Sequence, residues 1–156
     1  MNIPYKTKLY TLFAWIIFTI IFIAVILWQI YSNQVDFKFY FNNIFFIIVS
    51  IVFVRYIFLL KHTFIENKII IKLILMPVAI FVAIYSYMAL NDFIDFYQEY
   101  GIYAYLQHLP LKKQYSLGDY IFGEYIFFGV LAVISSILLP IRLLISVWRV
   151  YNKGHE

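Results

Sequence analysis

The sequence contains no cysteine and few charged residues. Without cysteine the chain has no disulfide, no thiolate nucleophile and no thiolate metal ligand. Charged residues make up 13% of the 156 residues and apolar residues 65%, whereas soluble domains average about 25% and about 45–50%. A soluble domain of this size could not cover so much apolar surface with so little charge. The composition therefore indicates a chain that folds in lipid.

Four apolar stretches are each long enough to cross a bilayer, which takes about 20 residues. We predict an all-α polytopic membrane protein, with four transmembrane helices in one bundle forming a single domain over 1–156. The first stretch is uncharged from Leu9 to Val35, longer than the core of about 7–15 residues in a signal peptide. A three-span count stays open, because the second and fourth stretches carry charge near one end. The predicted spans are about 9–31, 41–60, 69–90 and 120–139, with an external segment at 91–119 and a basic tail at 141–156.

Several residues within or beside these spans carry specific expectations. Arg55, near the end of the second span, is expected to reach the headgroups by snorkelling. Pro77 is expected to kink the third span and Pro140 to bend the chain after the fourth. Glu124 is the only acid inside a span. We interpret it as an interfacial residue in contact with water, in preference to a proton-transfer carboxylate.

The basic residues divide unevenly between the two sides that four spans define. The side of the termini holds nine of the twelve Lys and Arg residues and two acids, and the other side holds three bases and six acids. Because cytoplasmic loops are enriched in Lys and Arg, we predict that both termini are cytoplasmic. The bias towards Ile, Phe, Tyr, Asn and Lys indicates an AT-rich genome. We favour a bacterial origin, and hence the inner (plasma) membrane, over the alternative of an organellar one. The nine bases are Lys6, Lys8, Arg55, Lys61, Lys68, Lys72, Arg142, Arg149 and Lys153.

The spans lack the residues that most intramembrane chemistry requires. The three histidines, His62, His108 and His155, all lie outside the predicted spans, so none is placed to ligate a buried haem. Arg55 and His62 have the Arg-x6-His spacing of some RNA-cleaving domains, but positive-inside placement explains them more simply. No phosphate loop or metal-ligand spacing is present. We predict a non-enzymatic protein with no cofactor, no metal and no nucleic-acid partner.

The external segment after the third span is the most distinctive part of the sequence. At helical spacing three acids share one face and several aromatic residues share the other, so a helix here would be amphipathic. Gly101 is expected to end it. Such a surface suits an aromatic belt at the membrane interface first, and a helix in such a belt can also be a docking face for a protein, where tyrosine is enriched. The candidate partner-binding residues are Asp92, Asp95, Tyr97, Glu99 and Tyr100.

Small residues recur at helical spacing in two spans. Small side chains let membrane helices approach closely, so we predict that these two faces meet within one chain. Contact with a partner helix is the alternative. The candidate packing residues are Ala79, Ala83 and Ser86 in the third span and Gly129, Ala132 and Ser136 in the fourth.

These features favour a protein that binds a protein partner in the membrane or on its outer side, with membrane lipid around it. In its plan of four spans, two cytoplasmic ends, a longer second external loop and a basic tail, the chain is similar to the immunity proteins of pore-forming bacteriocins of the colicin A type. The resemblance is architectural and implies an inhibitor of a membrane partner, without assigning residues. The alternatives are an accessory subunit of a respiratory, secretion or transport complex, and a small oligomeric channel or transporter. The channel is least favoured, because no span offers a continuous polar stripe.

The predicted orientation is tested by labelling single cysteines in the cysteine-free chain. Cysteines at Asn33 and Gln114 are expected to react with an impermeant maleimide in intact cells, because both positions are external. A cysteine at Asn67 is expected to stay unlabelled until the cells are opened. Labelling at Asn67 in sealed cells would contradict the orientation.

Overall fold

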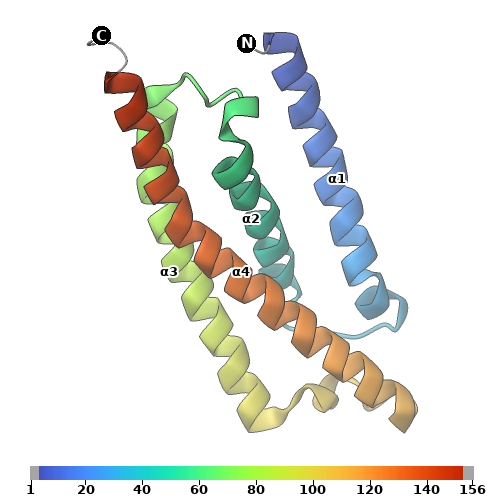
Figure 1. The fold of residues 1–156 in the computed structure, drawn as a ribbon. Helices are drawn as coiled ribbons and strands as arrows, with labels where there is room; N and C mark the ends of the chain where they lie inside the picture. Colours follow the sequence, from blue (N-terminus) through green and yellow to red (C-terminus); the bar gives the residue numbers. More distant parts are fainter. Residues whose placement is uncertain (1–3, 153–156) are drawn as a thin grey trace.

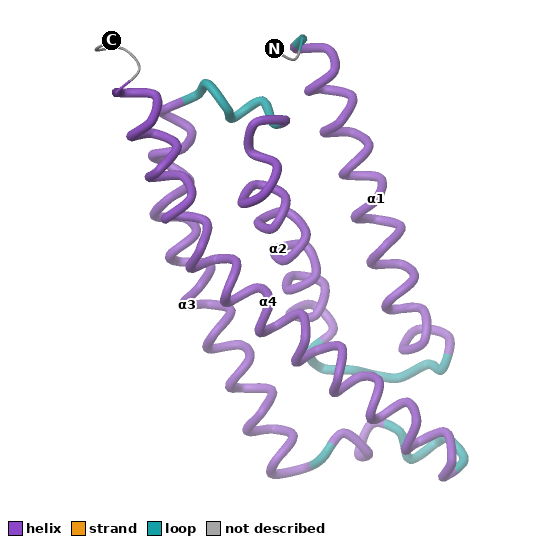
Figure 2. Tube along the Cα trace, in the orientation of Figure 1, coloured by secondary structure: helices purple, strands orange, loops and turns teal. Residues whose placement is uncertain are grey.

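The computed structural model describes residues 4–152, which form four long helices and contain no strand. The helices follow one another along the chain and run alternately up and down (Figures 1 and 2). Two short 3-10 turns lie in the connections, η1 at Leu60–His62 and η2 at Ile102–Tyr105. The long helices are α1 (Tyr5–Ser32), α2 (Tyr40–Leu59), α3 (Ile69–Tyr100) and α4 (Leu111–Asn152).

All four long helices are long and apolar enough to cross a membrane, so the predicted count of four is confirmed over the described residues. The first turn of α1 and the last turn of α4 lie at the same end of the bundle, together with the α2–α3 connection (Figure 1). We refer to this end as the terminal end. The other end, with the α1–α2 and α3–α4 connections, is the distal end.

The third and fourth helices are longer than the predicted spans. Residues 91–100 are the last turns of α3, and residues 111–119 are the first turns of α4. At 1.5 Å per residue, the 42 residues of α4 span about 63 Å, roughly twice the hydrocarbon core of a bilayer. The segment predicted as an external amphipathic helix or loop therefore consists of two helix extensions and a connection at 101–110. Gly101, with φ 69°, ends α3 as expected.

Two prolines lie inside helices without ending them. Both α3 at Pro77 and α4 at Pro140 continue as single helices. The tail predicted after Pro140 is thus the last part of α4 as far as Asn152, and residues 153–156 of that tail lie outside the described residues.

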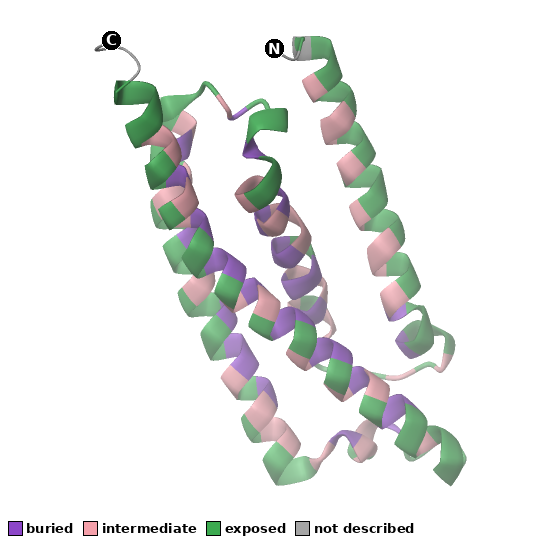
Figure 3. Cartoon of the chain, viewed as in Figure 1, coloured by how far each residue is buried: buried purple, intermediate pink, exposed green. Residues whose placement is uncertain are grey.

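The core of the bundle is built around α4, which packs against α3 and α2. Buried residues recur along α4 every three or four positions and form one continuous stripe (Figure 3). That spacing places them on one face of a helix. The large apolar members of the stripe are Leu117, Ile121, Tyr125, Phe128, Leu139 and Leu143.

The predicted small residues lie inside the bundle, and one of them lies at a close helix contact. Ala79, Ser86, Gly129, Ala132 and Ser136 are all buried, and Ala83 is half-buried. A Cβ atom added to Gly129 would lie 2.6 Å from Leu90 Cδ1 of α3 and 3.2 Å from Phe46 Cε2 of α2. Gly129 is therefore the point where three helices meet. The small-residue face of α4 contacts α2 as well as α3.

The first helix stands apart from this core. It makes few contacts with α2 and α4, and its surface is mostly exposed except near the distal end (Figure 3). There Leu27 and Ile30 are buried, and the Tyr120 hydroxyl of α4 donates a hydrogen bond to the Ile26 carbonyl at 2.7 Å. In a soluble protein such an exposed apolar helix would be unstable, whereas lipid can cover it.

The close approach at Gly129 makes a packing prediction. Gly129→Leu places a bulky side chain against Leu90 and Phe46, and overpacking of this kind costs about 1–3 kcal/mol. We expect a lower thermal midpoint in detergent. Ile137→Leu, on an exposed position of the same helix, is the control and is expected to keep the wild-type midpoint. Equal midpoints for both variants would contradict the packing.

Candidate functional site

The three candidate acids lie together on the outside of the distal end. Asp92, Asp95 and Glu99 are all exposed on the last three turns of α3. The only ion pair in the described part of the chain joins Lys8 to Glu66 at the terminal end. None of the three acids therefore forms an ion pair within residues 4–152, and together they form a negatively charged surface, which we call the acidic face.

The two candidate tyrosines have different environments. Tyr97 is half-buried, and its ring centroid lies 4.3 Å from that of Phe122 in α4. Tyr100 is 62% exposed, with its ring stacked 5.4 Å from Phe96. Tyr97 thus packs within the chain, and Tyr100 is the tyrosine that can reach a partner beside the acidic face.

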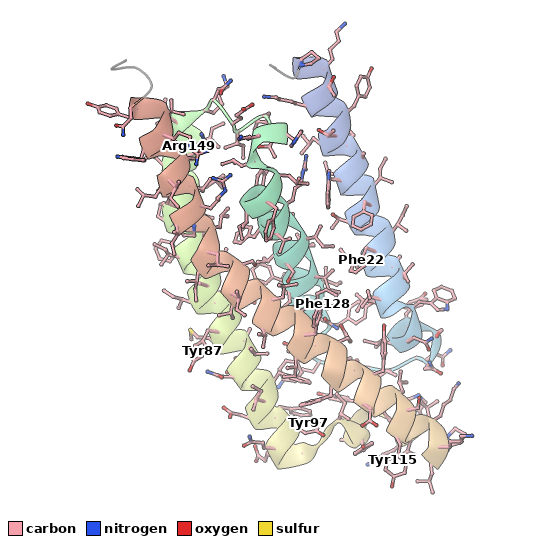
Figure 4. All side chains as sticks on the ribbon, in the orientation of Figure 1. Phe22, Tyr87, Tyr97, Tyr115, Phe128 and Arg149 are labelled. Carbon is pink, nitrogen blue, oxygen red and sulfur yellow. The ribbon has the colours of Figure 1, made fainter. Side chains whose placement is uncertain are left out.

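A cluster of packed aromatic rings lies on the buried side of the same turns of α3. Phe93 of α3 and Tyr125 of α4 are both fully buried, with ring centroids 4.0 Å apart. Phe37 and Phe39 of the α1–α2 connection pack against both rings. Aromatic pairs contribute about 0.5–1.5 kcal/mol each beyond the area they bury. This cluster joins three parts of the chain and fixes the last turns of α3 in place (Figure 4 labels Tyr97 in this region).

Tyr105 extends this cluster into η2. Its ring lies 6.0 Å from Phe37 and 5.3 Å from Phe96. Burial, and then the nearby Asp36 carboxylate, raise the pKa of the Tyr105 phenol above its ordinary value. The phenol therefore stays neutral at physiological pH and adds no charge beneath the acidic face.

Glu124 is buried, contrary to the expectation that it contacts water at an interface. It is 9% exposed, and its Oε1 accepts a hydrogen bond from Asn43 Nδ2 of α2. Within the described residues Glu124 Oε2 and Asn43 Oδ1 are both buried without a hydrogen-bond partner. A buried polar atom without a partner costs about 1–3 kcal/mol. This pair is a polar contact between α2 and α4 that sequence reasoning missed.

A signal for Glu124 was present in the sequence. One helical turn before Gly129, on the same face of α4, lies Tyr125, and Glu124 is its neighbour in the sequence. The partner could not be found in this way, because the sequence does not show which helix faces Glu124.

Arg55 is also buried, contrary to the expectation that it snorkels to the headgroups. It is 7% exposed, and its guanidinium carbon lies 5.4 Å from the centroid of the Trp15 ring in α1. The geometry is that of a cation–π contact. Arg55 therefore lies against an aromatic ring of α1.

Lys72 is a second buried cation, and it has hydrogen-bond acceptors. Its ammonium donates to Ser146 Oγ of α4 at 2.9 Å and to the backbone carbonyl of Glu66. These contacts tie the start of α3 to the end of α4.

The described residues contain no group of three or more His, Asp and Glu side chains that could hold a metal ion. His108 lies near the distal end, with Nε2 at 2.9 Å from the Asn33 carbonyl, and His155 lies outside the described residues. The absence of catalytic, metal and cofactor sites stays a prediction.

Comparisons with known proteins give no relative for this chain. No family model, no curated protein and no solved structure matches it.

The unpaired atoms of Asn43 and Glu124 make a stability prediction. In Glu124→Gln the new amide can accept from Asn43 Nδ2 and donate to Asn43 Oδ1, which satisfies the atoms left unpaired in the wild type. We expect its thermal midpoint in detergent at pH 8 to equal or exceed that of the wild type.

Glu124→Ala is the comparison, because it leaves the buried Asn43 without a partner. We expect it to lose about 1–3 kcal/mol of stability. A Glu124→Gln variant as unstable as Glu124→Ala would contradict the pairing.

Proposed function

We propose that this chain is an integral protein of a bacterial inner membrane, with four spanning helices and both termini in the cytoplasm. The lengths of the four apolar helices support the first part. The orientation rests on the Lys and Arg residues, of which nine of twelve belong to segments on the side of the termini. In this orientation the acidic face lies on the outer side.

We propose that the protein is not an enzyme and acts by binding a protein partner at the membrane. The observation that carries this proposal is the acidic face, which holds three exposed carboxylates that form no ion pair within residues 4–152. Its support by packed aromatic rings means that a partner meets a preformed surface, which lowers the entropy cost of binding. The chemistry favours a partner with a basic patch, because complementary charge steers association. An immunity-like inhibitor of a membrane toxin is one protein of this kind.

An accessory subunit of a membrane complex is the second candidate. The exposed apolar surface of α1 favours it, because a helix with few contacts inside its own chain is free to pack against helices of other subunits. A small channel or transporter is the third candidate. It has less support, because the buried residues of α4 are mostly apolar and Glu124 is the only charged one among them.

The acidic face is tested by replacing Asp92, Asp95 and Glu99 together with Ser. We expect membrane insertion to be unchanged, since acidic residues contribute little to topology. Co-purification of the native partner, normalised to inserted protein, is expected to fall severalfold. In the wild type it is expected to weaken with added salt, because charges are screened over about 8 Å at physiological ionic strength.

Asp119→Ser is the matched control, because it removes an exposed acid from α4 outside the acidic face. Unchanged capture by the triple variant would contradict the proposed binding surface.

The two tyrosines separate binding from folding. Tyr100→Ala is expected to reduce partner capture with little change in thermal midpoint, because Tyr100 is exposed and aromatic anchors contribute about 2 kcal/mol or more at interfaces. Tyr97→Ala is expected to lower the midpoint, because it removes the ring contact with Phe122. The reverse pattern would show that Tyr100 supports the fold and Tyr97 the partner.

A further inference from the structure

Arg55 is a buried cation whose hydrogen-bond donors are unused. The guanidinium contacts the ring faces of Trp15 at 5.4 Å and Tyr56 at 6.0 Å. Within residues 4–152 it has no hydrogen-bond acceptor and no acidic partner, whereas the other buried cation, Lys72, has two acceptors. A guanidinium carries five N–H donors, and no Arg55 nitrogen is among the fully buried unpaired atoms of residues 4–152. The donors are therefore both unused and reachable from outside the chain, which suits an anion.

Two apolar grooves meet at this guanidinium, one on each side of Trp15. The first has a volume of about 280 Å³ and lies between α1 and α2, lined by residues such as Ile20, Ile23 and Ile48. The second has a volume of about 300 Å³ and lies between α1, α2 and α4. Phe22 and Phe128 line it from opposite helices, with ring centroids 6.0 Å apart (Figure 4). Trp15 and Arg55 line both grooves.

The cation lies towards one end of the first groove. Along α1 the groove extends from Leu12 to Ile23, a rise of about 16 Å, and Arg55 contacts it at Trp15. Along α2, Arg55 lies one turn from the end of the helix at Leu59. The groove therefore continues from the cation into the apolar middle of the bundle, which suits an amphiphile with its charged group near the terminal end.

We propose that the junction of α1, α2 and α4 binds an anionic phospholipid. The phosphate accepts hydrogen bonds from the Arg55 guanidinium, a planar fork that matches phosphate oxygens. One acyl chain lies in each groove, on either side of Trp15. A phosphate supplies the acceptor that the apolar face of a partner helix lacks, so the unpaired guanidinium favours a lipid as the occupant of these grooves.

The site favours an anionic headgroup over a zwitterionic one. A zwitterionic lipid carries its own ammonium group. This group competes with Arg55 for the phosphate, and the Arg55 guanidinium repels it. The nearest base on α1 that shares the face of Trp15 is Lys8, and it is already paired with Glu66 at 2.5 Å. Arg55 is therefore the residue expected to set the lipid preference.

Trp15 provides a direct reporter for this site. Trp28→Phe and Trp148→Phe replace the two other tryptophans, both exposed, and leave Trp15 as the only indole. The purified full chain is titrated in mild detergent with brominated phosphatidylglycerol or brominated phosphatidylcholine, and quenching of Trp15 fluorescence is recorded. We expect half-maximal quenching at an about fivefold lower concentration of phosphatidylglycerol, the effect of one basic residue on an anionic lipid.

Variants assign this preference to the guanidinium. In Arg55→Gln, the two lipids are expected to quench Trp15 fluorescence at equal concentrations. In Arg55→Lys, part of the preference for phosphatidylglycerol is expected to remain. Arg149→Gln, which removes an exposed base of α4, is the control and is expected to keep all of it. Equal quenching by both lipids in the protein with Trp15 as its only tryptophan overturns the proposal. A preference for phosphatidylglycerol that survives in Arg55→Gln overturns it as well. The comparison of the two lipids on the protein that keeps Arg55 decides the question even where Arg55→Gln does not fold.

Discussion

The close packing of α4 against two other helices at Gly129 is the contact on which the rest of the structure depends. Lipid gives apolar helices no hydrophobic reason to associate, so they need surfaces that fit closely. A glycine at this position lets Leu90 of α3 and Phe46 of α2 reach the α4 backbone together. The buried stripe of α4 continues from this point in both directions. It brings α2, α3 and α4 into one unit and leaves α1 as an outer helix.

Polar side chains also form hydrogen bonds between the helices at a few points. Ser50 Oγ of α2 donates to the Phe128 carbonyl of α4 at 3.1 Å, and Arg142 Nε of α4 donates to the Ile57 carbonyl of α2 at 2.9 Å. In an apolar medium such groups have few other partners, so these contacts fix register even though each contributes only about 1 kcal/mol. At Arg55 the chain offers aromatic rings but no acceptor, and the lipid proposal follows from that difference.

The number and approximate positions of the helices could be predicted from the sequence, because long uncharged stretches are a strong signal. Their rotation about their own axes could not, and this explains the errors at Arg55 and Glu124. Both were placed correctly along a helix, but depth alone does not show whether a side chain faces lipid, water or another helix. Glu124 faces Asn43 and Arg55 faces Trp15 because of packing between segments distant in the sequence. Likewise, the small residues indicated a close contact but not that Gly129 also meets α2.

The central claim is that α3 and α4 meet at Gly129 within a single chain, and a cross-link tests it most directly. Leu90→Cys with Gly129→Cys places two thiols at the closest contact, in a protein with no other cysteine. In native membranes, mild oxidation is expected to give a disulfide within one chain. Met88→Cys with Phe127→Cys, both exposed positions of the same helices, is expected to give none. A disulfide that forms only between two chains, or equally well at the exposed pair, would contradict the account.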